Sequence, residues 1–170
     1  MKVLIVSDSH GLTSELLEIK KRHENEVEGM IHCGDSELPA DMDEMQDFWT
    51  VRGNCDYDSS YVKERIELAG NRSFYITHGH LYNVKMSLMN LTYKAQEVGA
   101  HIACFGHSHI AGSEMIDGII YINPGSIFLP RMRKERTYAI IDFNDQTATV
   151  HFYTVDGAEV PSLRNEFTLT

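Results

Sequence analysis

Five short segments that combine carboxylate, amide and imidazole side chains follow five successive apolar runs, and no other feature constrains the fold as strongly. The segments are Asp8-Ser-His10, Gly34-Asp35, Gly53-Asn54, His78-Gly-His80 and Gly106-His107-Ser-His109. Each preceding run is rich in Val, Ile, Phe or Tyr, as strands are. Loops at strand ends can bring residues that are distant in sequence to one crevice. The order therefore predicts one binuclear metal site at one edge of a layered α/β domain.

The series Asp-x-His, Gly-Asp, Gly-Asn, His and Gly-His-x-His resembles the motifs of the calcineurin-like metallophosphoesterases. The resemblance extends from Asp8 to His109, well over half of the chain, and the short length indicates the small bacterial and archaeal phosphodiesterase branch. It implies two mixed β-sheets packed as a sandwich and flanked by helices, in four layers. The residue pattern alone indicates only an α/β chain with a late antiparallel portion.

The hydrophobic periodicity predicts strands in the first half of the chain that alternate with two helices. The helices are expected from Thr13 or Ser14 to His23 and from Asn83 to Val98, the second ending at Gly99. Gly70 and Asn71 supply the positive φ of a hairpin turn. Strands are expected at 3–7, 27–33, 48–51, 61–68, 73–77 and 102–105, and then in an antiparallel group at 115–122, 137–143 and 148–154.

Length and charge limit the class of protein. A chain of 170 residues that is 42% hydrophobic predicts a single domain over 1–170. It has no apolar run of the roughly 18 to 20 residues that a membrane helix needs, so we expect a cytoplasmic protein without a membrane partner. The net charge of −10 disfavours a long nucleic acid and leaves a small phosphoester substrate as the expected partner. A homo-oligomer is compatible with the sequence.

The resemblance also implies a ligand set for two divalent metal ions. The first ion takes Asp8, His10, Asp35 and His109, and the second takes Asp35, Asn54, His78 and His107. Asp35 is expected to bridge the two ions. Mixed carboxylate, amide and imidazole ligands favour a transition metal over Ca²⁺ or Mg²⁺, with Mn²⁺ as the first expectation and Zn²⁺, Fe or Ni²⁺ as alternatives.

Several of these residues also have a purely structural interpretation. Asp8 could cap the first helix, Asn54 could be a turn residue and His78 could be a buried core histidine. The occurrence of all seven candidate ligands in order favours the metal site. His80 lies two residues after His78, where it either contacts a substrate oxygen or orients a ligand.

The implied reaction is hydrolysis of a phosphodiester by a hydroxide that bridges two metal ions, with Asp35, Asn54 and His80 as catalytic residues. Many relatives have Gly-Asn-His where this chain has Gly53-Asn54-Cys55, so protonation of a poor leaving group is in doubt. Packing is the default expectation for Cys55. The alternative function is a metal-poor protein-interaction scaffold, because a retromer subunit resembles the same fold.

Three further segments have expected but less specific roles. The acidic segment 37–47 is expected to be a solvated helix face or loop. Asn123-Pro-Gly-Ser126 resembles a family segment that passes close beneath the metals. Arg131 is a candidate phosphate contact, although a surface ion pair is the preferred interpretation.

Overall fold

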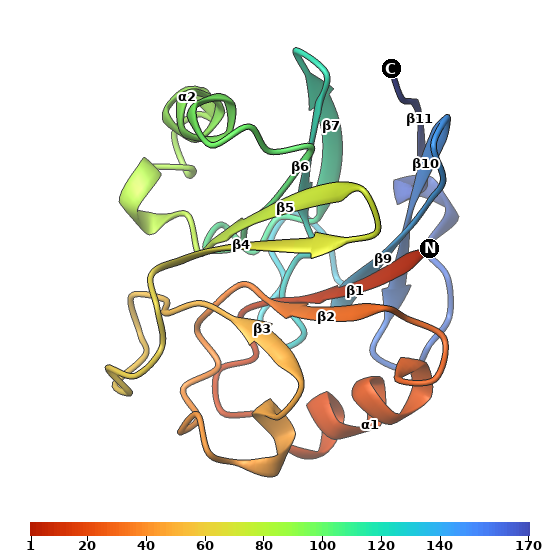
Figure 1. The fold of residues 1–170 in the computed structure, drawn as a ribbon. Coiled ribbons are helices and arrows are strands. Elements are labelled where there is room, and N and C mark those ends of the chain that lie inside the picture. The colour runs from red at the N-terminus through yellow and green to blue at the C-terminus, as the bar shows by residue number, and fades with distance from the viewer.

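Two β-sheets face each other, and one helix covers the outer side of each sheet (Figure 1). The computed structural model describes residues 1–170. The first sheet has the order β11-β10-β9-β1-β2-β3, with β1 (Lys2–Val6), β2 (Gly29–His32), β3 (Phe48–Thr50), β9 (Thr137–Phe143), β10 (Thr147–Thr154) and β11 (Asn165–Thr168). The second has the order β4-β5-β6-β8-β7, with β4 (Glu64–Ala69), β5 (Arg72–Thr77), β6 (Ile102–Cys104), β7 (Gly112–Ile116) and β8 (Ile119–Asn123).

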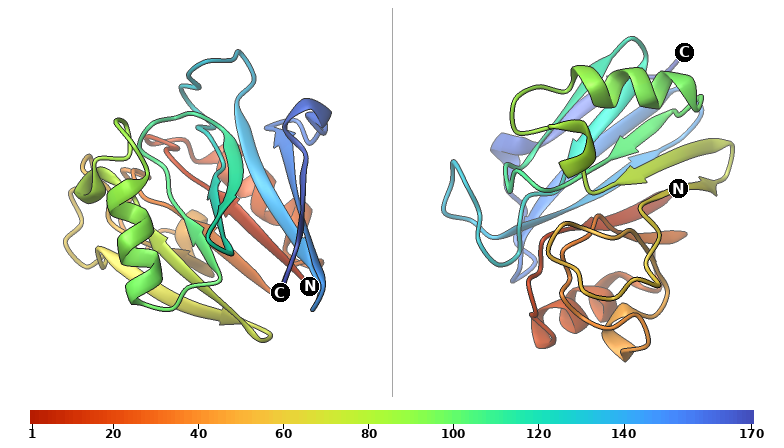
Figure 2. Two further views of the ribbon diagram at one scale, coloured as in Figure 1. Left: turned by 90° about the horizontal axis from the view of Figure 1, so that it is seen from above. Right: turned by 90° about the vertical axis from the view of Figure 1, so that its left-hand side faces the viewer.

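Both sheets are mixed. Strand β1 runs parallel to β2 and antiparallel to β9, while β6 runs parallel to both β5 and β8. The helices are α1 (Ser14–His23) and α2 (Met89–Glu97), and three 3₁₀ turns are η1 (Asp43–Met45), η2 (His80–Tyr82) and η3 (Pro161–Leu163). Figure 2 shows the helices on opposite sides of the sandwich. The expected four-layer fold is confirmed.

The core follows from the side-chain alternation of the strands. Residues such as Ile5, Ile76 and Ile122 point between the sheets and form the largest apolar cluster. The other face of the first sheet packs Leu4 and Val6 against α1, and the other face of the second sheet packs Tyr121 near α2. Because both faces of each sheet are covered, the central strands are apolar throughout, as β1 is in Leu4–Val6.

The second helix is shorter than the periodicity predicted. We expected it to begin at Asn83, but α2 begins at Met89. Asn83 has a left-handed backbone, with φ of 54°. Val84 is buried against Gly79, so the segment before α2 folds back toward the second sheet as an irregular wall. Val84 and Leu88, which have helical spacing in the sequence, therefore pack against the second sheet from a loop.

The topology brings the five ligand-bearing loops to one end of the sandwich. Strands β1, β2 and β3 are mutually parallel, so the loops that follow them leave the same edge. Strands β5 and β6 are parallel in the second sheet, and their following loops carry His78 and His107. The hydrogen bond from Gly106 N to the His78 carbonyl, at 2.9 Å, joins these two loops directly.

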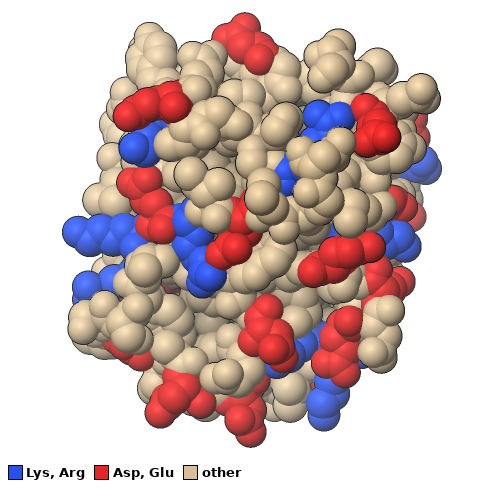
Figure 3. Space-filling model, viewed as in Figure 1, with Lys and Arg blue, Asp and Glu red and all other residues tan.

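The surface carries acidic and basic side chains in alternation, and the face shown in Figure 3 has no continuous basic stripe. This agrees with the overall negative charge of the chain. Neither α1 nor α2 has the length and apolar character required to cross a membrane.

Candidate metal centre

The carboxylate of Asp8 lies fully buried at the end of β1. Its Oδ2 accepts hydrogen bonds from Ser7 Oγ at 2.6 Å and from the backbone N–H of His107 at 3.1 Å. Its Oδ1 has no conventional hydrogen bond, although it lies 3.1 Å from His109 Nε2 and 3.7 Å from His10 Nε2. A buried anionic oxygen in this state needs a positive partner, because its desolvation is otherwise uncompensated.

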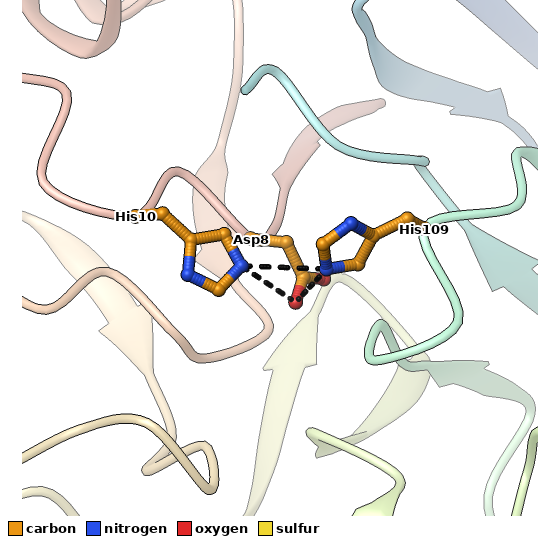
Figure 4. Close-up of side chains that lie close together, drawn as sticks. All are labelled: Asp8, His10 and His109. Atoms are coloured by element: carbon orange, nitrogen blue, oxygen red, sulfur yellow. Dashed lines mark hydrogen bonds and ion pairs between the residues drawn. The ribbon is translucent and has the colours of Figure 1, made fainter. Parts of the chain in front are cut away.

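Three imidazoles direct Nε2 toward Asp8 Oδ1 and use Nδ1 for another contact. His78 Nδ1 donates to the Cys33 carbonyl at 2.7 Å and His109 Nδ1 to the Leu129 carbonyl at 2.7 Å. A carbonyl can only accept, so each Nδ1 carries the hydrogen. The neutral rings therefore present lone pairs at Nε2, which is the arrangement of metal-binding histidines whose other nitrogen is anchored. Figure 4 shows His10 and His109 pointing toward one another over Asp8.

His10 completes this group through a carboxylate partner. Its Nδ1 lies 3.0 Å from Glu37 Oε2, and its Nε2 lies 3.3 Å from His109 Nε2 and faces Asp8. Asp8, His10 and His109 thus form one group of candidate ligands with their donor atoms close together.

Asp35 lies between the two sides of the site. Its Oδ2 is 3.1 Å from His78 Nε2, and its Oδ1 accepts the backbone N–H of Cys55 at 2.8 Å. Asp35 belongs to one candidate ligand group with Asp8 and His78, and to another with His10 and Cys55. This position between two groups is the one expected of a bridging carboxylate. Asp8 is also shared between groups, which the sequence did not indicate.

The ligand loops share an unusual backbone conformation. In three of them the residues at positions i and i+2 are both left-handed: Asp8 and His10 with φ of 53° and 43°, His107 and His109 with 70° and 60°, and Asp35 with Glu37, both at 56°. Such a conformation costs about 1 to 3 kcal/mol for a non-glycine residue, and it occurs mainly at functional sites. Asp and His tolerate it better than most residues.

Two carboxylates that were not predicted as site residues hold this geometry. Asp56 is buried and accepts three backbone N–H groups, from Asp35, Glu37 and Gly53, at 2.7 to 2.9 Å. It therefore fixes the loop after β2 relative to the loop after β3. Glu37 is exposed in a loop, as expected for its acidic segment, and it also contacts His10, which the sequence did not indicate. The only sequence signal for Glu37 is its place two residues after Asp35.

Asn54 and His107 lie at the site but outside the carboxylate groups. The Asn54 amide donates to Cys55 Sγ at 3.6 Å, and to neither Asp8 nor Asp35. The His107 ring lies 5.1 Å from the His78 ring and 6.1 Å from the His80 ring, measured between centroids. Their assignment as ligands of the second ion stays a prediction.

Cys55 and His80 border the same region. Cys55 is half-buried, with its Sγ close to His10 and Asp35. Its expected role as a small packed side chain stays a prediction. Burial and the Asp35 charge raise the pKa of its thiol to about 11, so it keeps its proton at neutral pH. His80 has a buried Nδ1 without a partner. Burial and His78 lower its pKa, so the neutral imidazole prevails at neutral pH.

The electrostatics of the buried groups are those of a cation site. Burial raises the pKa of the Asp8 carboxyl, but the close imidazoles of His109 and His78 outweigh it, and the pKa lies below its ordinary value. Burial also lowers the pKa of His78, but Asp35 and Asp8 reverse this and raise it. The two carboxylates thus favour a positive charge beside His78, the charge that a bound metal ion would supply. The unpaired Asp8 Oδ1 and the anchored rings fit a divalent cation held by oxygen and nitrogen ligands.

The segment after β8 supports the centre from below, as the resemblance implied. Ser126 Oγ donates to the Asp8 carbonyl at 2.8 Å and accepts the backbone N–H groups of Phe128 and Leu129. Arg131 is exposed and forms no ion pair, so its preferred interpretation as a surface ion pair is wrong. The remaining histidines lie outside the centre, although His32 links Ser9 to the backbone of Gly34 beneath it.

Comparison with known proteins yields one family. Residues 1–146 match the model of the calcineurin-like phosphoesterase superfamily domain. The chain is 51% identical to the probable metallophosphoesterase YsnB of Bacillus subtilis over 169 residues, which is 99% of this chain and 100% of that protein. It is also 28% identical to the phosphodiesterase YfcE of Escherichia coli K12 over 109 residues, covering 59% of this chain and 54% of that protein.

Solved structures show the same fold. A crystal structure of a predicted phosphoesterase from Streptococcus pneumoniae superposes with a TM-score of 0.95 at 33% identity, covering 98% of this chain and 97% of that one. The Zn²⁺ complex of Vps29 from Entamoeba histolytica superposes with a TM-score of 0.78 at 17% identity, covering 100% of both chains. The second similarity concerns the fold alone.

The contact between Glu37 and His10 generates a prediction. In Glu37→Gln the amide replaces an anionic acceptor, so His10 is held less firmly and becomes a weaker ligand. We expect metal affinity to fall by about 10- to 100-fold, as measured by competition with a chelator. Glu44→Gln, in the same acidic segment, is the matched control and is expected to bind as the wild type does. Equal affinity in both variants would show that Glu37 does not position His10.

Proposed function

Because the chain belongs to the calcineurin-like phosphoesterase superfamily, we propose that it hydrolyses phosphodiester bonds with the help of two divalent metal ions. The observation that carries the proposal is the convergence of His10, His78 and His109 on the unpaired Asp8 Oδ1. Every one of these rings has its Nδ1 occupied by an acceptor. The three Nε2 atoms therefore face Asp8 Oδ1 and are available to bind a cation there.

The ligands divide into two sides. Asp8, His10 and His109 would hold the first ion, and Asp35 and His78 would hold the second together with Asn54 and His107. Asp35 would bridge the ions from its place between His10 and His78. Ions held in this way lower the pKa of a water molecule and stabilise the charge that develops on phosphoryl oxygens.

Asp56, His80 and Cys55 determine what the protein contributes to the reaction besides the metal ions. Asp56 keeps Asp35 in place through its hydrogen bonds to the backbone of both loops. Neutral His80 can accept or donate one hydrogen bond at a substrate oxygen, but its lowered pKa makes it a weak source of a proton for the leaving group. The Cys55 thiol, with its raised pKa, is weaker still. These properties favour esters whose leaving groups need no proton, such as aryl diesters.

We propose that the protein binds Mn²⁺, with Zn²⁺, Fe and Ni²⁺ as alternatives. Carboxylate, amide and imidazole ligands suit all four ions, so affinity does not separate them. The rate of diester hydrolysis after reconstitution with each ion identifies the productive one.

A scaffold function is the second candidate, because the fold matches Vps29 closely. That structure is described as a Zn²⁺ complex, so metal content does not distinguish the candidates. Catalytic turnover does. A folded protein that holds metal and hydrolyses neither diesters nor monoesters with any of the four ions would favour the scaffold.

The two-sided ligand set predicts a stoichiometry. Reconstitution with excess Mn²⁺ followed by removal of free metal should leave two ions per chain by elemental analysis, because Asp35 joins two ligand groups. A ratio that stays at one or below would contradict the binuclear proposal.

A charge-neutral substitution at the bridge tests the site itself. Asp35→Asn removes the anionic charge between the two groups, so diester hydrolysis is expected to fall by at least about 10²-fold. Asp41→Asn is the matched control, because Asp41 is exposed and lies outside the site. Equal losses in both variants would mean that the site is misplaced.

Cys55 occupies the position of the leaving-group acid in relatives that have Gly-Asn-His. Cys55→His should therefore raise hydrolysis of alkyl monoesters relative to aryl diesters, by at most the roughly 10² to 10⁴-fold that a positioned general acid contributes. The gain should be largest for poor leaving groups, measured as the slope of log rate against leaving-group pKa. An unchanged ratio of monoester to diester rates would show that the thiol does not limit the reaction.

A further inference from the structure

A cavity of about 590 Å³ opens beside the candidate metal centre on the outer face of the second sheet. Phe105 and Tyr121 form its floor, and Val84 and Leu88 from the segment before α2 form one wall. Its volume lies within the range of small-molecule sites, and its walls are mainly apolar with a few polar groups, as such sites are. None of these four side chains belongs to a candidate metal ligand.

The cavity adjoins the metal centre. Ser108 lines it and lies between His107 and His109 in the chain. Val84, on the opposite wall, packs against Gly79, which lies between His78 and His80. The lining of the cavity therefore lies next to two loops that carry candidate metal ligands, the loop after β5 and the loop after β6. A substrate whose phosphate is held at the metals can place a substituent there.

Two cationic side chains line the cavity. Lys85 and Arg131 both line it, and neither forms an ion pair within the chain. The backbone N–H of Arg131 donates to the His109 carbonyl at 3.0 Å, which places this residue beside the metal centre. Two free cations on a chain of net charge −10 mark a local attraction for a small anion.

The inner end of the cavity has unused hydrogen-bonding capacity. Tyr121 lies opposite Glu114 in the β7–β8 ladder, and its buried hydroxyl has no partner within the chain. Asn123, two residues along β8, donates to Ser108 Oγ at 2.9 Å and so marks the end near the metals. Two strand residues span about 7 Å. The cavity thus combines cationic, aromatic and neutral polar lining groups.

We propose that this cavity binds a ring-bearing ester group of the phosphodiester substrate, while Lys85 and Arg131 attract the phosphate. The inference rests on the proposed function and names the substrate class that the function leaves open. The apolar floor and wall provide contact for a ring, which a methyl or ethyl group cannot fill. Glu114, which also lines the cavity, favours a ring that carries a hydrogen-bond donor.

Gly112 offers a direct way to block the cavity. It lies on β7 opposite Asn123 and on the same strand face as Glu114, and it lines the cavity. A Cβ atom built on Gly112 meets no atom within 4 Å, and its φ is not left-handed. A larger side chain is therefore accommodated without a clash of the Cβ atom and extends into the open space.

The test compares two substrates that share a leaving group, methyl 4-nitrophenyl phosphate and phenyl 4-nitrophenyl phosphate. The wild type, loaded with Mn²⁺, is expected to prefer the phenyl ester in kcat/KM by about tenfold or more, the scale of a filled apolar pocket. Gly112→Leu should remove the preference, and Gly112→Ala should reduce it. Arg131→Gln should lower kcat/KM for both esters, whereas Arg133→Gln, its matched control in the same loop, should not.

Binding without turnover gives an independent readout. Phenylphosphonate and methylphosphonate are titrated by NMR into protein stripped of metal with EDTA, for the wild type and for Gly112→Leu. We expect the phenyl compound to bind more tightly to the wild type, and the variant to lose the difference. Thermal unfolding checks that the variant is folded. If it is not, Leu88→Ala, which removes part of the apolar wall, takes its place.

The outcomes separate this inference from the proposed function. Hydrolysis of both esters with no preference for the ring, or with a preference that Gly112→Leu leaves intact, overturns the cavity assignment and leaves the phosphodiesterase standing. Absence of hydrolysis with every metal ion overturns the proposed function. In that case the phosphonate titration decides the cavity, and equal binding of both probes overturns its assignment as well.

Discussion

The buried carboxylate of Asp8 is the interaction on which the rest of the centre depends. An anion with no exposed surface costs several kcal/mol unless its surroundings compensate for the desolvation. Ser7 and the His107 backbone satisfy one oxygen, and three imidazoles surround the other. Because these partners come from both sheets, the placement of one charge requires the two sheets to meet at a fixed distance and orientation.

Close approach of the backbone is the condition for this arrangement. A Cβ on Gly106 would lie 2.1 Å from Ser7 Oγ, and one on Gly53 would lie 2.0 Å from Asp35 Oδ1. Neither contact is sterically possible, so these positions exclude every side chain. The glycines that precede the ligands in the motifs are thus required by the fold around the carboxylates. They allow loops from two sheets to pack against the same two anions.

The sequence predicted that these loops meet because each loop combines two independent signals, an apolar run and a residue type that can bind metal. Asp8, His10, Asp35, His78 and His109 come together as the order of motifs implied. The parts that were missed lack such a pair of signals. Glu37 stands in an acidic segment where any carboxylate has the composition of a solvated surface, and only its left-handed backbone and its contact with His10 distinguish it.

The fold was predictable for a similar reason, and its one larger error has a physical cause. Alternating apolar runs place strands with little ambiguity, whereas apolar residues at helical spacing can be buried without a helix. Val84 and Leu88 satisfy the helical pattern, yet they pack on the second sheet from an irregular segment. Periodicity predicts which side chains are buried, but it does not determine the backbone conformation of the segment that carries them. The same irregular segment forms the wall of the cavity beside the metal centre.

The distribution of charge reconciles an acidic chain with an anionic substrate. Lys85 and Arg131 border the apolar cavity, and Arg52 and Lys63 border a smaller polar one of about 290 Å³ that reaches His80. None of these four cations is neutralised by a carboxylate partner in an ion pair. Their fields act over about one Debye length, roughly 8 Å at physiological salt, so they would attract the small phosphoester that we propose as the substrate. The more distant acidic surface would repel a long polyanion, because such a molecule must contact that surface as well.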